Sequence, residues 1–98
     1  MSAIKGKQRR YLRALGQRLT PSLHVGHEGV TDGVVRQAET LLEAHELIKV
    51  RVSENAPEDR HEIAKTLAAR ASAELAQVIG RTALLYRASK EKPTIILP

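Results

Sequence analysis

The local motif with the clearest chemistry in this chain is a glycine-bounded turn, Gly26-His27-Glu28-Gly29. It follows a short β-compatible run and precedes a helix that Thr31 or Asp32 can cap. Glycine lets a backbone approach a ligand closely, and the free amides of a helix N-terminus attract anions. KH-type domains clamp a nucleotide backbone with such a loop. Two glycines at this spacing also form ordinary turns, and Glu28 repels phosphate unless a protonated His27 offsets its charge.

A second feature is the basic segment near the N-terminus, where every charged residue before Glu28 is positive. Its members are Lys5, Lys7, Arg9, Arg10, Arg13 and Arg18. Lys5, Arg9 and Arg13 are four residues apart, so a helix places them in one stripe. Such clustering indicates contact with a polyanion, although a charged stripe can also be a solvated helix face.

The net charge of +5 is unevenly distributed along the chain. Lys and Arg counted against Asp and Glu give +5 for residues 1–30, −3 for residues 31–80 and +3 for residues 81–98. The C-terminal basic positions expected to contribute are Arg81, Arg87 and Lys90. The charge hypothesis requires that these positions share one face with the N-terminal segment.

No pattern typical of catalysis or metal binding is present. The chain has no cysteine, and it lacks a Walker loop and a nucleophile elbow. His24 and His27 lack a third ligand at diagnostic spacing, and His45 and His61 are predicted to lie on the surface at helix ends. We therefore expect no enzymatic activity, no metal and no cofactor.

Aromatic residues are limited to two tyrosines, Tyr11 and Tyr86, with no Phe or Trp. This argues against an RRM, whose sheet stacks bases on several aromatic rings. Tyr86 is predicted to add one stacking contact, and Tyr11 is predicted to be a core residue with its hydroxyl at the surface.

Periodicity and breakers predict the order α-β-α-β-α-β-β in one domain spanning residues 1–98. Three helices are expected: residues 5–18, a second from Thr31 or Asp32 to about 45, and a third from a start near 55–59 to about 71. Strands are expected at 23–25, 47–52, 75–79 and 82–86, and residues 94–97 are expected to form a short edge strand. Pro57 suits a first helical position, and Gly80-Arg81 suits a type II′ hairpin. Helices alternating with strands indicate an α/β (α+β) fold with parallel strand pairs and one antiparallel hairpin.

Several segments together resemble the CRM domain, the chloroplast RNA splicing and ribosome maturation module, in its stand-alone bacterial YhbY form. They are Gly6 to Arg13, Val25 to Thr31, Glu46 to Val50, Pro57 to Asp59, Gln77 to Thr82 and Leu85 to Arg87. The resemblance covers nearly the whole chain in order. One departure is that His27 and then Glu28 follow the first glycine, where family loops usually carry a lysine.

The resemblance implies a four-stranded mixed sheet with flanking helices, similar to the C-terminal domain of translation initiation factor three. It also implies an RNA-binding protein acting on ribosomal RNA in the precursor of the large subunit, with its contacts at the basic first helix and the glycine loop. We expect the protein to be a monomer. The absence of an apolar leader or membrane span leads us to expect a cytoplasmic protein that binds no membrane. The alternative is a protein–protein adaptor that docks on a ribosomal protein or assembly factor through the acidic middle segment.

Overall fold

The computed structural model describes residues 4–98, in which three helices alternate with four strands. The elements are α1 (Gly6–Gly16), β1 (Pro21–Val25), α2 (Asp32–His45), β2 (Leu47–Val52), α3 (Arg60–Arg70), β3 (Glu74–Ile79) and β4 (Thr82–Tyr86). The order α-β-α-β-α-β-β predicted from the sequence is confirmed.

The four strands form one mixed sheet in the order β1-β2-β4-β3. β1 pairs with β2 in parallel, whereas β4 is antiparallel to both of its neighbours. The tight connection between β3 and β4 is possible because Gly80 adopts a positive φ of 55°, which a type II′ turn requires at its first central residue. The mixed sheet and its hairpin therefore agree with the prediction.

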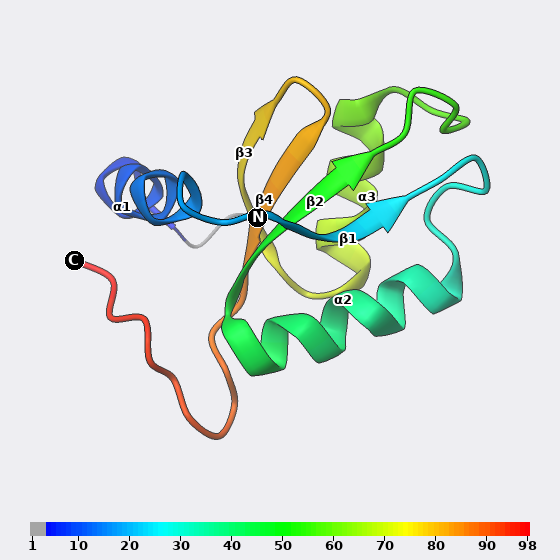
Figure 1. Cartoon of the computed structure of the whole chain (residues 1–98). Coiled ribbons are helices and arrows are strands. Elements are labelled where there is room, and N and C mark those ends of the chain that lie inside the picture. The colour runs from blue at the N-terminus through cyan, green and yellow to red at the C-terminus, as the bar shows by residue number, and fades with distance from the viewer. Residues whose placement is uncertain (1–3) are drawn as a thin grey trace.

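Helices cover both faces of this sheet, with α1 on one side and α2 and α3 on the other (Figure 1). Side chains of β2 alternate between the two layers. Ile48 and Val50 enter the larger core beneath α2 and α3, and Leu47 enters the smaller core beneath α1. Leu12 of α1 is fully buried in that smaller core. The molecule is thus a three-layer arrangement with two separate apolar clusters.

Local capping explains where the helices begin. The Thr31 hydroxyl accepts from the Val34 N–H at 3.1 Å and starts α2 as predicted. The Asp59 carboxylate accepts from the His61 N–H at 2.9 Å, so α3 begins at Arg60. The prediction that Pro57 occupies the first helical position is therefore wrong, because the acidic cap two residues later sets the boundary.

The C-terminal segment, residues 87–98, forms no strand, so the predicted edge strand at 94–97 is wrong. Its backbone instead bonds to the buried carboxylate of Glu46, which accepts from the N–H groups of Ser89, Thr94 and Ile95 at 2.6–2.8 Å. Further along, the Gln8 side chain donates to the Pro98 carbonyl at 3.2 Å. The segment consequently folds back against the side of the sheet that carries α1 (Figure 1).

Candidate nucleic-acid interface

The glycine loop connects the end of β1 to the start of α2, and its two glycines have different roles. Gly29 has a φ of 74°, and a Cβ at this position would lie 3.0 Å from Cγ of Pro57. Gly26 has nothing within 4 Å of its hypothetical Cβ. Gly29 is therefore required by the fold, whereas Gly26 leaves open space at the loop. The side chains of His27 and Glu28 are exposed between them.

Helix α1 presents most of its basic side chains to solvent. Lys5, Lys7, Arg10 and Arg13 are all exposed. Arg9 differs because its Nη1 donates to the carbonyl oxygen of Leu75 at 2.6 Å. Arg9 thus attaches the helix to β3. Its guanidinium is engaged within the protein, whereas the exposed basic side chains of α1 are available to an external ligand.

Arg87 lies on the opposite side of the sheet and is largely buried, with 17% of its side chain exposed. Its guanidinium donates to the carbonyls of Ala71 at 2.9 Å and Glu39 at 3.3 Å, and it lies 3.8 Å from the Glu43 carboxylate. Arg87 therefore joins the C-terminal half of α2 to the end of α3. This position corrects the expectation that Arg87 shares a nucleic-acid-binding face with the first helix.

The two tyrosines have the reverse of their predicted environments. Tyr86 is only 8% exposed within the smaller core, whereas Tyr11 is 41% exposed on α1. Burial, followed by the nearby charge of Glu46, raises the pKa of Tyr86. The stacking role predicted for Tyr86 is contradicted because its ring is covered by protein, and the core position predicted for Tyr11 is wrong.

The remaining C-terminal basic positions, Arg81 and Lys90, lie apart from α1. Arg81 occupies the β3–β4 turn, where its guanidinium donates to the Ser53 carbonyl at 3.4 Å and lies 3.9 Å from Glu54. Lys90 is exposed, and its backbone N–H donates to the Glu43 carboxylate at 3.1 Å. The structure therefore does not unite the basic ends of the chain in one patch.

Two basic residues that the sequence reasoning missed lie on the α1 side of the sheet. Lys49 and Arg51 alternate with Ile48, Val50 and Val52, which face the larger core. Alternation therefore directs both basic side chains toward the face that carries α1. The signal was available in the sequence, because this strand's alternation already separated the basic positions from the apolar ones.

Ion pairs distinguish the two sides of the molecule. The Lys and Arg residues that pair with carboxylates do so on or near α2, α3 and the loop after β2: Lys65 with Glu62, Arg70 with Asp32, Arg81 with Glu54 and Arg87 with Glu43. Across residues 4–98, the exposed cations of α1 have no such partner, and neither do Lys49 and Arg51. The α1 side of the described chain thus carries a set of cations without carboxylate partners.

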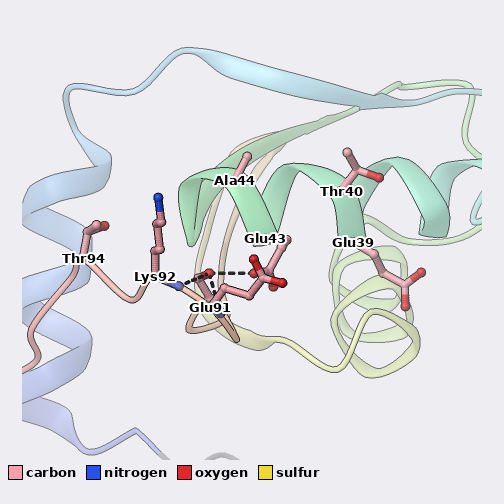
Figure 2. Close-up of a pocket in the computed structure, with 8 residues that line it drawn as sticks. Glu39, Thr40, Glu43, Ala44, Glu91, Lys92 and Thr94 are labelled. Carbon is pink, nitrogen blue, oxygen red and sulfur yellow. Dashed lines mark hydrogen bonds between the residues drawn. The ribbon is translucent and has the colours of Figure 1, made fainter.

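A groove between α2 and the C-terminal segment has the opposite character (Figure 2). Glu39 and Glu43 line it from α2, and Glu91 and Lys92 line it from the C-terminal segment, so carboxylates outnumber the one cation. Hydrogen bonds, first from the Ser89 hydroxyl and then from the Lys90 N–H, lower the pKa of Glu43 and keep it ionised. This acidic groove repels a phosphate backbone.

Two other site types have no support within the described part of the chain. Residues 4–98 contain no group of three or more His, Asp or Glu side chains arranged to hold a metal ion. None of the helices in this range is both long and apolar enough to cross a bilayer.

Comparison with known proteins gives consistent matches over nearly the whole chain. A model of the CRS1 / YhbY (CRM) domain matches residues 4–87. "Probable RNA-binding protein YqeI" of Bacillus subtilis (strain 168) is 44% identical over 95 residues, which cover 97% of this chain and 99% of the relative. A protein of Haemophilus influenzae named "RNA-binding protein" is 35% identical, with 93% and 92% covered. The solution structure of SAV1595 from Staphylococcus aureus superimposes with a TM-score of 0.82 at 42% identity, covering 97% and 99% of the two chains.

Proposed function

Because the chain belongs to the CRS1 / YhbY (CRM) domain family, we propose that it binds RNA and catalyses no reaction. The resemblance noted in the sequence is thereby confirmed at the level of the family. The names of the relatives from Bacillus subtilis and Haemophilus influenzae both describe RNA-binding proteins, which supports the same activity for this chain.

The observation that carries this proposal is the unpaired positive charge of α1. Its exposed side chains Lys7, Arg10 and Arg13 have no carboxylate partner within residues 4–98. Cations of this kind bind phosphates and release the counterions condensed on the nucleic acid, which favours association. The bond from Arg9 to Leu75 fixes the helix on the sheet, so these cations are presented from a positioned element.

The glycine loop supplies the second contact in the proposal. Open space beside Gly26 permits close approach of an RNA backbone to the loop, as in KH-type domains. Glu28 is exposed at the same loop and opposes a nearby phosphate through its charge. We therefore assign the larger share of the binding free energy to α1 and the smaller share to the loop.

A salt titration tests the proposal directly. Fluorescence anisotropy with a labelled structured RNA is expected to show binding whose logarithmic association constant falls linearly with the logarithm of the salt concentration. Competition with a DNA duplex of equal length separates RNA recognition from general polyanion binding. Absence of binding at low salt, or equal competition by the DNA duplex, would contradict the proposal.

The partner we propose is structured ribosomal RNA in the precursor of the large ribosomal subunit. This finer assignment rests on the resemblance to stand-alone bacterial CRM proteins and not on the geometry. Crosslinking in cells, followed by sequencing of the crosslinked RNA, tests it. Recovery of large-subunit ribosomal RNA above its background abundance is the expected result, and recovery of unrelated transcripts alone contradicts it.

A second candidate function, that of a protein–protein adaptor, is favoured by the acidic groove in Figure 2. The carboxylates of Glu39, Glu43 and Glu91 offer a surface for a basic protein segment. Co-purification of a protein partner that survives nuclease treatment, and is lost when Glu39 and Glu91 are replaced by Gln, would support this function.

A further inference from the structure

The last turn of α1 and the adjoining edge of the sheet enclose a second groove, distinct from the acidic one. Its apolar lining includes Leu15, Leu19 and Ile95. Its polar lining includes Arg18, Lys49 and His45, and no Asp or Glu of the described chain lines it. The groove therefore combines an apolar surface with basic side chains at one place.

The cations of this groove are available to an external ligand. Neither Arg18 nor Lys49 has an ion-pair partner within residues 4–98. Leu15, which also lines the groove, is 36% exposed although it is a large apolar residue. Exposed apolar surface next to unpaired cations matches a ligand that has both a flat apolar part and a negative charge.

We propose that this groove binds an unpaired nucleotide of RNA, with its base against Leu15 and Leu19 and its phosphate near Arg18 and Lys49. Sequence-tolerant recognition of single strands combines a basic groove with apolar surfaces for the bases; other proteins use aromatic rings for this, and Leu15 and Leu19 take that place here. Bases that are paired in a duplex have their faces stacked and cannot enter such a groove. The inference rests on the proposed RNA binding and deepens it, because it names an unpaired segment adjoining the structured region as part of the ligand.

The position of the groove supports this ligand over a protein segment. It adjoins the end of α1, so an RNA bound along the exposed cations of Lys7, Arg10 and Arg13 continues toward it. Arg51 extends the positive charge beyond the groove on the same face of the sheet. The charge complementarity is thus continuous from the helix to the sheet.

The test compares two labelled RNA hairpins, one blunt and one with a single-stranded uridine tail, by fluorescence anisotropy. The wild-type protein is expected to bind the tailed hairpin about tenfold more tightly, because the tail adds a base contact and a phosphate contact to those of the hairpin. Leu15→Ser is expected to reduce this preference while affinity for the blunt hairpin changes little, and Lys49→Gln is expected to weaken binding of the tailed hairpin more than binding of the blunt one. Arg36→Gln on α2 is the charge-matched control, because Arg36 is exposed on the opposite side of the sheet.

Each outcome separates this inference from the proposed function. Equal affinity of the wild-type protein for both hairpins overturns the groove assignment and leaves RNA binding intact. Binding of neither hairpin overturns both. Thermal unfolding monitors the folding of each variant, and Arg18→Gln, at an exposed position after α1, provides the measurement if Leu15→Ser does not fold.

Discussion

The backbone N–H of Ser89 donates to the carboxylate of Glu46 at 2.6 Å, across 43 positions of the chain. The other carboxylate oxygen of Glu46 accepts from the N–H groups of Thr94 and Ile95, each at 2.8 Å. Glu46 itself is only 1% exposed and ends α2 with a positive φ of 67°. A buried carboxylate at the junction of α2 and β2 thus holds the C-terminal segment in place.

Replacing Glu46 with Gln is expected to destabilise the protein by about 2 kcal/mol, because hydrogen bonds to a charged acceptor are strong and a buried donor left unpaired is costly. An NH2 group cannot accept a hydrogen bond. Whichever way the Gln amide is oriented, its NH2 therefore faces either the N–H of Ser89 or the N–H groups of Thr94 and Ile95, and those donors lose their acceptor. Thermal or denaturant unfolding measures the effect. Glu58→Gln, at an exposed position, is the control, and equal stability of the two variants would show that Glu46 does not anchor the segment.

The same carboxylate predicts a pH dependence of stability. Burial acts to raise the pKa of Glu46, but the hydrogen bonds from Ser89, Ile95 and Thr94 outweigh it and lower the pKa from 4.5 to about 2. A folded-state pKa below the unfolded value means that this stabilisation is complete above pH 4.5 and is lost as the pH falls toward 2. Urea unfolding from pH 6 to pH 2.5 is expected to show a steeper loss of stability for the wild-type protein than for Glu46→Gln. Parallel curves would contradict the assignment.

The two loop glycines are expected to respond differently to substitution. Gly29→Ala places a Cβ 3.0 Å from Pro57 in a left-handed conformation, so we expect a loss of about 1–3 kcal/mol in unfolding free energy. Gly26→Ala meets no neighbouring atom and is expected to leave the melting temperature nearly unchanged while weakening RNA binding. Unchanged RNA affinity in a folded Gly26→Ala variant would place the loop away from the ligand.

The parts of the fold that follow from local patterns were predictable. Strand β2 has the predicted bounds, because alternation and flanking residues define it locally. The edge strand at 94–97 failed because the N–H groups of Thr94 and Ile95 bond to Glu46, which is distant in sequence. A contact of this kind, between residues distant in sequence, cannot be predicted from the hydrophobic pattern of residues 94–97 alone.

The residues of the candidate site were predictable only where the exposure of a side chain follows from its position on its own helix or strand. The exposed cations of α1 were identified, but Arg87 was misjudged because its partners come from α2 and α3. Tyr86 was misjudged because it belongs to the smaller core, against which Ile95 and Leu97 of the distant C-terminal segment pack, and Tyr11 was misjudged because it lies outside that core. The positions of charged residues along the sequence likewise do not show on which side of the sheet their side chains lie.

Removing the exposed cations of α1 is expected to flatten the salt dependence of RNA binding. The triple variant Lys7→Gln, Arg10→Gln, Arg13→Gln removes three candidate phosphate contacts, so the slope should decrease by roughly two to three. Arg87→Gln is the contrasting variant, expected to lower stability through its lost bonds with little change in the slope. Anisotropy titrations at several salt concentrations measure both, and an unchanged slope for the triple variant would exclude α1 from the interface.

Reversing the charge of Glu28 tests whether the loop lies near phosphate. Glu28 is exposed between the two glycines, so Glu28→Lys should fold normally and replace a repulsive charge with an attractive one. RNA affinity is expected to rise by about tenfold at low salt, with the gain shrinking as salt increases. Glu62→Lys, which makes the same charge change on the exposed surface of α3, controls for the effect of net charge alone. An equal gain in both variants would mean that the loop makes no local contact with the RNA, and the binding would then be assigned to the α1 side of the sheet.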